Sequence, residues 1–171
     1  MKTKITVLVL FLCTSLSAQK HAFKVSPVGF FNNGFGASYE NYIGNSDAIE
    51  VSIVSGSLDK VQNSAIDLVG GEIKYKKYFH NKATFKGLYA AGFANITSAG
   101  SENGVGNLLI IAPGALCGYQ FMLGKKTWTS GFIFDINAGF GYNFINRTTN
   151  ENLNRIKGFQ PRLGIVIGYA F

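Results

Sequence analysis

Charged side chains recur at alternate positions along this chain of 171 residues. Glu72, Lys74 and Lys76 form the clearest run, and their two-residue spacing places all three on one face of a β-strand. The segments defined below put nine charged residues on this kind of face: Lys24, Glu40, Glu50, Glu72, Lys74, Lys76, Lys86, Asp135 and Arg162. Four acids and five bases around one interior could pair as a structural plug or line the gate of a thin conducting path.

Side chains for catalysis or metal binding are sparse. His21 and His80 are the two histidines, and no Cys/His cluster has the spacing of a metal site. The Gly139–Gly141 run lacks the third glycine and the following helix of a nucleotide loop. Cys117 is interpreted as a small apolar filler. We therefore expect no enzyme activity, no metal and no cofactor.

The first 18 residues have the layout of a secretory signal peptide. Lys2 and Lys4 precede the apolar run 5–13, and small residues lead to a cleavage point after Ala18. The run is too short for a membrane-spanning helix. Its removal lowers the net charge from +7 to about +5 and leaves one domain, residues 19–171. Nucleic acid is a poor partner for an exported chain without long basic runs.

A period of two continues through the remaining chain and divides it into segments. Positions 159–171 and 128–144 alternate most clearly between large apolar and small or polar residues. Eight such segments are predicted strands: 22–31, 35–43, 48–57, 66–79, 84–97, 107–123, 128–144 and 158–171.

The connectors between these segments alternate in length. Short turns at 44–47, 80–83 and 124–127 alternate with longer polar connectors at 57–65, 98–106 and 145–157, although 32–34, the first of the second set, is short. This alternation predicts an all-β fold, an eight-stranded antiparallel up-and-down barrel with both termini at the short-turn end. Outer-membrane barrels have short periplasmic turns and long outer loops.

The face opposite the charges is rich in aromatic residues. It includes Phe23, Phe35, Tyr39, Tyr89 and Phe93, and only Asp67 and Lys77 place charges on it. So many rings cannot fit inside eight strands, and a lysine or arginine at the bilayer midplane costs about 2–4 kcal/mol. The aromatic face is therefore predicted to meet lipid. The opposite, inward face carries most strand glycines: 36, 56, 70, 92, 114, 118, 131, 139, 141, 164 and 168.

The C-terminal strand carries a resemblance to a known class. Ile165, Ile167, Tyr169 and Phe171 resemble the C-terminal signal of proteins that the outer-membrane barrel assembly machinery inserts. With the stretches 114–119 and 139–142, the mature chain resembles a family of small, uncharacterised outer-membrane β-barrels of Gram-negative bacteria. The resemblance implies a fold and a location, and it implies no reaction.

The expected role is structural or interactional. The chain would be a monomer in outer-membrane lipid, assembled by the barrel machinery, with periplasmic termini and an extracellular partner reached through loops 57–65, 98–106 and 145–157. One alternative is a narrow channel for ions or very small solutes. Another is a periplasmic lipocalin-like carrier of an apolar ligand, whose apolar face would point inward.

Overall fold

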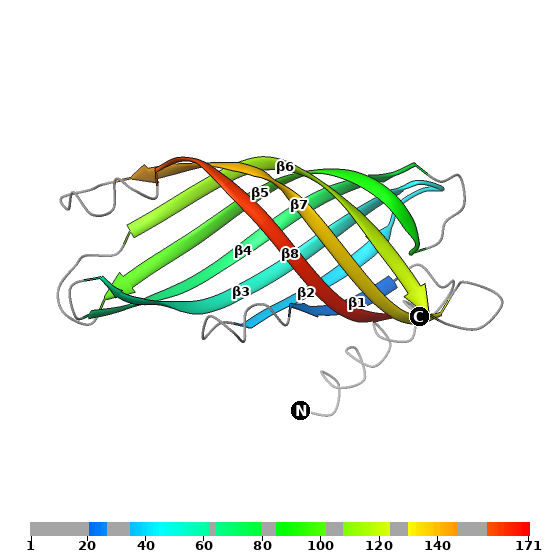
Figure 1. Ribbon diagram of the computed structural model, residues 1–171, viewed down its shortest axis with the longest axis horizontal. Coiled ribbons are helices and arrows are strands. Elements are labelled where there is room, and N and C mark those ends of the chain that lie inside the picture. The colour runs from blue at the N-terminus through cyan, green and yellow to red at the C-terminus, as the bar shows by residue number, and fades with distance from the viewer. Residues whose placement is uncertain are drawn as a thin grey trace, which may run out of the picture.

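The computed structural model describes residues 21–26, 35–61, 64–79, 85–101, 108–123, 130–146 and 157–171. They form eight strands: β1 (His21–Ser26), β2 (Phe35–Tyr42), β3 (Asp47–Val61), β4 (Ser64–Tyr78), β5 (Gly87–Ser101), β6 (Leu108–Leu123), β7 (Gly131–Asn146) and β8 (Gly158–Ala170). Each strand pairs antiparallel with the next, and β1 pairs with β8, so the sheet closes in chain order (Figure 1). The predicted eight-stranded up-and-down barrel is confirmed.

The predicted signal peptide, residues 1–18, lies outside the described residues. Within the described ranges, no helix has the length and apolar character needed to cross a bilayer.

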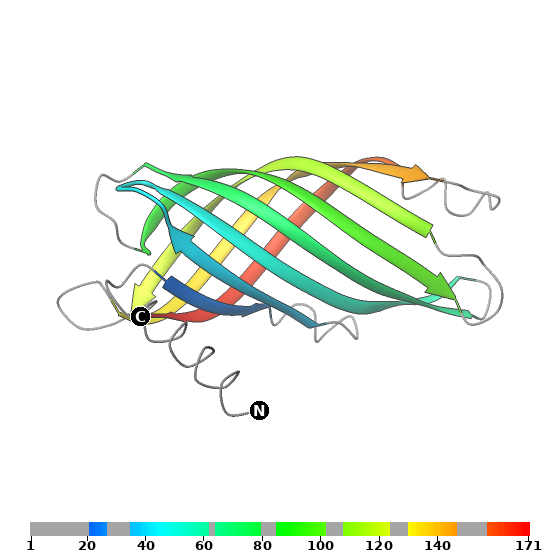
Figure 2. The ribbon, with the colours of Figure 1, turned by 180° about the vertical axis from the view of Figure 1, so that it is seen from behind.

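The first hairpin is the shortest part of the wall. β1 has 6 residues and β2 has 8, whereas β3 has 15, and Figure 2 shows this difference from behind. Pro27 follows β1, and proline has no N–H to donate to a neighbouring strand. β1 pairs with β8 at four positions, from Ala22 to Val25. The predicted extension of this strand to residue 31 lies outside the described residues.

The β3–β4 and β5–β6 hairpins extend further than the sequence predicted. The predicted loop 57–65 is largely strand, because β3 continues to Val61 and β4 begins at Ser64. The predicted loop 98–106 likewise begins late, since β5 continues to Ser101. These boundaries were wrong because the ladder needs only backbone groups. Polar residues such as serine can therefore continue it beyond the apolar part of the strand.

The predicted faces are confirmed in seven strands and wrong in β5. Leu88 and Ile96 point outward there, whereas Tyr89 and Phe93 are buried in the lumen, the opposite of the prediction. Gly92, predicted inward, is exposed and has open space where a Cβ would lie.

Glycines on β6 explain why β5 turns its rings inward. Tyr89 pairs with Gly118 and Phe93 pairs with Gly114. A Cβ at Gly118 would lie 2.6 Å from the Tyr89 ring, and a Cβ at Gly114 would overlap the Phe93 ring. The rings therefore lie over bare backbone of the neighbouring strand, in space that any larger residue would fill.

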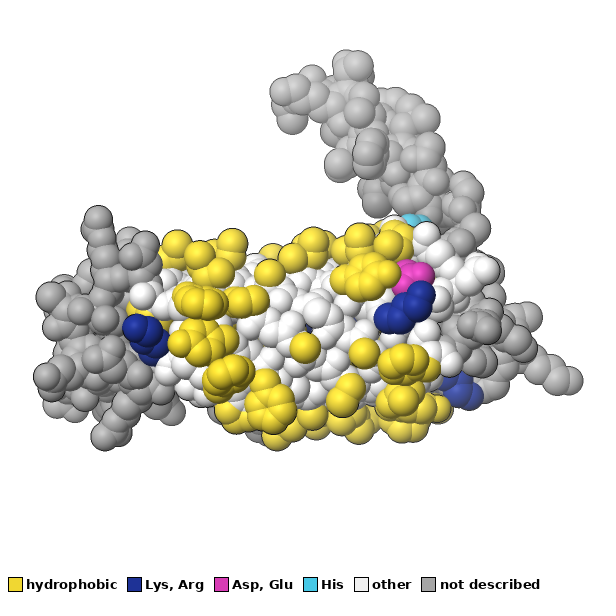
Figure 3. Space-filling view, turned by 90° about the horizontal axis from the view of Figure 1, so that it is seen from above, with side chains coloured by type: hydrophobic (Ala, Val, Ile, Leu, Met, Phe, Trp, Pro, Cys, Tyr) yellow, Lys and Arg dark blue, Asp and Glu magenta, His cyan; other side chains and the backbone are white. Residues whose placement is uncertain are grey.

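The outer surface of the barrel is apolar. Leu163 is 83% exposed and Phe140 is 65% exposed, and Figure 3 shows hydrophobic side chains gathered towards both ends of one face. Rings contact one another near each end: Phe132 with Tyr169 at one and Tyr142 with Phe159 at the other. Lys77, a predicted exception on this face, forms an ion pair with Asp47 at 2.8 Å.

Candidate functional site

Eight of the nine predicted charged residues meet inside the barrel. We call them the lumen charge network: Lys24, Glu40, Glu50, Glu72, Lys74, Lys76, Asp135 and Arg162. They come from β1, β2, β3, β4, β7 and β8, since strands on all sides turn alternate side chains inward. Four are acids and four are bases, so the network carries no net charge.

Lys24 on β1 is a centre of the network. Its Nζ forms an ion pair with Glu40 and lies 3.2 Å from Glu50 Oε2 and 3.4 Å from Asp135 Oδ2. It also donates a hydrogen bond of 2.7 Å to Gln120 Oε1. One ammonium group therefore bridges acids from three strands and an amide from a fourth.

Lys76 on β4 joins the same three acids from another side. Its Nζ lies 2.9 Å from Glu40, 2.6 Å from Glu50 and 3.2 Å from Asp135. It also lies 4.6 Å from the centre of the Tyr89 ring, within the range of a cation–π contact. Glu40 and Asp135 thus each face two ammonium groups, and Glu50 faces a third from Lys74, which compensates for their burial.

An aromatic plug closes the lumen beside this group. We define it as Tyr42, Tyr78, Phe85 and Tyr89, all of which are buried. The Tyr42 ring stacks on the Tyr78 ring, with 5.1 Å between ring centres, and meets the Phe85 ring edge-on, with 4.7 Å between ring centres. The hydroxyl groups are also used, because Tyr78 donates to Glu40 at 2.6 Å and Tyr89 donates to Asp135 at 2.7 Å.

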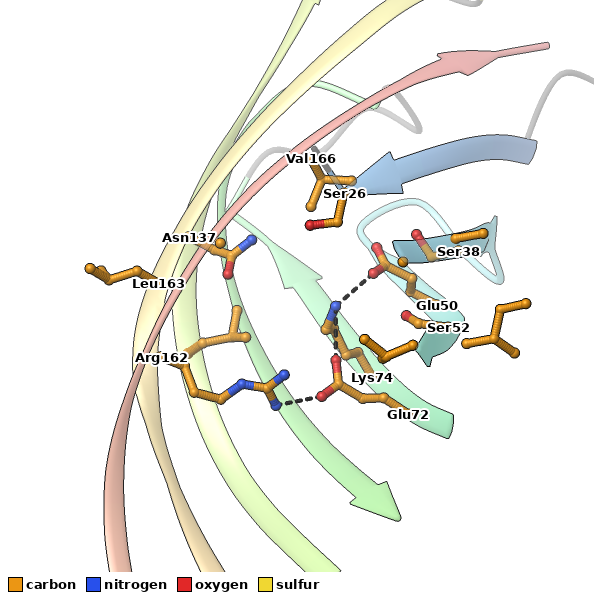
Figure 4. Close-up of a pocket in the computed structure, with 16 residues that line it drawn as sticks. Ser26, Ser38, Glu50, Ser52, Glu72, Lys74, Asn137, Arg162, Leu163 and Val166 are labelled. Carbon is orange, nitrogen blue, oxygen red and sulfur yellow. Dashed lines mark hydrogen bonds and ion pairs between the residues drawn. The ribbon is translucent and has the colours of Figure 1, made fainter. Parts of the chain in front are cut away.

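A second part of the network lies further from the short turns. Lys74 bridges Glu50 at 2.7 Å and Glu72 at 3.0 Å, and Glu72 forms an ion pair with Arg162 from β8. The Arg162 guanidinium lies 4.3 Å from the centre of the Phe93 ring. Figure 4 shows this chain of charges crossing from β3 and β4 to β8.

A cavity of about 140 Å³ adjoins this second part. Ser38, Ser52, Asn137 and Val166 line it together with the charged groups (Figure 4). Ser52 Oγ is buried without a hydrogen-bond partner in the described part of the chain.

The four carboxylates of the network are each paired with a lysine or with Arg162, so none of them is placed as an unpaired general base among the described residues. Among the described residues, no group of three His, Cys, Asp or Glu side chains could hold a metal ion. His21 lies at the short-turn end and stacks on Tyr39 at 5.7 Å.

Sequence reasoning missed several neutral partners of the network. In their predicted strands, Gln120 and Asn137 stand at the alternate positions that face inward, and this placement could have identified them. Tyr89 was missed because the predicted inward face of β5 was wrong; its signal is Gly118, the residue it pairs with on β6. The same phase predicted Lys86 in the lumen. Lys86 in fact precedes β5 and is partly buried. It lies two residues before Leu88, which faces outward, so it does not follow the inward-facing positions of β5.

The outer wall carries the remaining predicted residues. Ile165, Ile167, Tyr169 and Phe171, the predicted assembly signal, all face outward and are exposed. Cys117 also faces outward, in a shallow apolar groove of about 480 Å³ over β6, β7 and β8.

Comparison with known proteins adds no relative: no family model, curated protein or solved structure matches this chain.

Proposed function

We propose that the chain is a monomeric outer-membrane β-barrel of a Gram-negative bacterium with a structural or loop-mediated interaction role. The observation that carries this proposal is the inversion of a soluble protein's pattern. Large apolar side chains cover the outside, with Leu163 and Phe140 mostly exposed, while Lys24, Lys76 and Asp135 are buried inside. Water outside such a wall would promote aggregation, whereas a bilayer would solvate it.

A soluble carrier of an apolar ligand fits this lumen poorly. Such a carrier needs an apolar inner cavity, but charged groups and tyrosine hydroxyl groups fill much of the described lumen. The proposed orientation places the termini and short turns in the periplasm. The ends of the β3–β4, β5–β6 and β7–β8 hairpins would then present the predicted partner surface outside the cell, although 57–61 and 64–65 belong to strands.

Membrane fractionation tests the location. The protein should stay in the membrane pellet after a carbonate wash and leave it with detergent. Release by carbonate alone would contradict the proposal.

Surface proteolysis tests the orientation. A protease added to intact cells should cut near Arg147 or Arg155 and spare Lys125 and Lys126. The reverse pattern would require the opposite orientation.

Planar-bilayer recording separates a structural barrel from a channel. The rings of the aromatic plug are buried, and Lys24, Lys76 and Asp135 beside them are held in ion pairs, so an ion would have to displace packed or paired groups at that level. We therefore expect no steady conductance from the refolded protein. A steady conductance that Arg162→Ala changes would establish the channel instead, since Arg162 belongs to the lumen network.

A further inference from the structure

The lumen is closed at one end and accessible towards the other. The exposed fraction of the inward-facing residues of β3 rises with distance from the short turns: Ala48 is 0% exposed, Glu50 2%, Ser52 9% and Val54 41%. On β8, Ala170 is fully buried while the Arg162 side chain is 36% exposed. The lumen therefore forms a chamber that is closed at the aromatic plug and accessible from the end opposite the short turns.

The chamber is large enough for a small solute. Its cavity of about 140 Å³ is lined by Ser52, Glu72, Lys74, Asn137 and Arg162, among others (Figure 4). One water takes about 30 Å³ of liquid, so the space suits about four or five waters or one solute with few heavy atoms.

The charges of the lining select against ions. Glu50, Lys74, Glu72 and Arg162 form one continuous chain of alternating pairs, so their charges sum to zero. A charged solute would add an uncompensated charge to this balanced lining and would lose its own hydration.

The hydrogen-bonding groups of the lining favour a hydroxyl group. Ser52 Oγ is buried and has no partner within the described residues, although a hydroxyl can both donate and accept. A buried polar atom without a partner is costly, so a hydroxyl of a bound solute would relieve that cost.

We propose that this chamber binds a small, uncharged, polyhydroxylated solute of the glycerol class, which enters from the end opposite the short turns. The aromatic plug prevents its passage to the other end. The proposal concerns the lumen alone, so its tests do not depend on whether the barrel inserts into a membrane.

Cysteine accessibility tests whether the chamber is open. In the refolded full chain with Cys13→Ala and Cys117→Ala, Ser52→Cys and Ala48→Cys place a thiol on the same face of the same strand. A small neutral methanethiosulfonate should modify Ser52→Cys faster than Ala48→Cys by an order of magnitude, as mass spectrometry would record. Equal rates would overturn the proposal. If Ser52→Cys does not refold, Val54→Cys replaces it, and the reagent should again modify this thiol faster than that of Ala48→Cys.

Solute protection tests what the chamber binds. The thiol for this test is Val54→Cys, which lines the same chamber and leaves the Ser52 hydroxyl in place. Glycerol should slow the modification of Val54→Cys severalfold, while inorganic phosphate and glycine at equal concentration should not. The outward Cys117, retained in a Cys13→Ala chain, controls for viscosity and should react at an unchanged rate. Equal protection by phosphate or glycine would overturn the selectivity. A lack of protection by glycerol would mean that the chamber holds water only, and would overturn the binding site.

Discussion

Replacing Lys24 with methionine should be among the most damaging single changes in the lumen. The Lys24 ammonium contacts Glu40, Glu50 and Asp135 and donates to Gln120. Methionine fills a similar space, so the change mainly removes the charge and creates little cavity. The network would pass from no net charge to one excess negative charge while remaining buried.

The cost follows from the burial of the acids that lose a partner. Removing one member of a buried ion pair typically costs about 3–5 kcal/mol, because the remaining charge is left poorly compensated. Lys76 still faces all three acids, which argues for the lower part of that range. We expect Lys24→Met to lower the free energy of unfolding by about 3 kcal/mol.

Urea unfolding of the refolded protein in detergent micelles measures this loss. Circular dichroism would follow the strands, and the mobility difference between unheated and heated samples on a gel would report the closed barrel. Lys77→Met is the matched control, because it removes the same side chain from an exposed pair with Asp47 at the rim. Exposed pairs contribute little, so this control should unfold like the unmodified protein.

The double variant Lys24→Met/Glu50→Gln completes the test. It restores charge balance, so it should recover part of the stability that Lys24→Met loses, which gives a favourable coupling between the two positions. If Lys24→Met were as stable as Lys77→Met, or if the double variant were no better than Lys24→Met, compensation of buried charge would not explain this lumen.

Two further substitutions test the packing around the network in the same urea assay. Gly168→Ala should lose about 1–3 kcal/mol, because its Cβ would overlap the Phe23 carbonyl oxygen and lie 2.7 Å from Lys24 Cγ at the β1–β8 seam. Gly92→Ala, with open space outside the barrel, should lose nothing. An equal loss in both would exclude a steric cause. Tyr89→Phe should cost about 1–3 kcal/mol by removing the hydroxyl that Asp135 accepts, and Tyr119→Phe on the outer wall controls for the loss of a tyrosine hydroxyl. Indistinguishable values for these two would show that the buried hydrogen bond contributes nothing.

Much of the barrel could be predicted because the two faces of most strands differ sharply in chemistry. On β4, Glu72, Lys74 and Lys76 alternate with Ile73 and Tyr75, so one register turns these three charges inward and exposes these two apolar side chains. A shift of one residue would reverse all of them at once. Eight of nine lumen charges could be assigned from this contrast alone.

Strand ends could not be predicted as well, because they depend on pairing and not on composition. The polar residues at the end of β3 have the composition of a loop, but their backbone groups pair with β4 up to Val61 and Ser64. Conversely, the hydrogen-bonded partners of the network, such as Gln120 with Lys24, come from strands far apart in the chain. Parity could place them on the inward face, but only the closed barrel brings them together.

The failure at β5 has a physical cause that also suggests a remedy. Both faces of β5 are apolar, with Leu88, Ile96 and small alanines on one and Tyr89 and Phe93 on the other. Alternation alone therefore cannot choose between them. The neighbouring strand can distinguish them, because Gly114 and Gly118 lie on the same inward face of β6 as Gln120 and leave space that the Phe93 and Tyr89 rings of β5 fill. Inward-facing glycines four residues apart on one strand thus predict inward-facing aromatic residues on the strand that pairs with it. The same pairing makes room in a narrow lumen for Tyr89 of the aromatic plug and for Phe93, whose ring lies against Arg162 of the charge network.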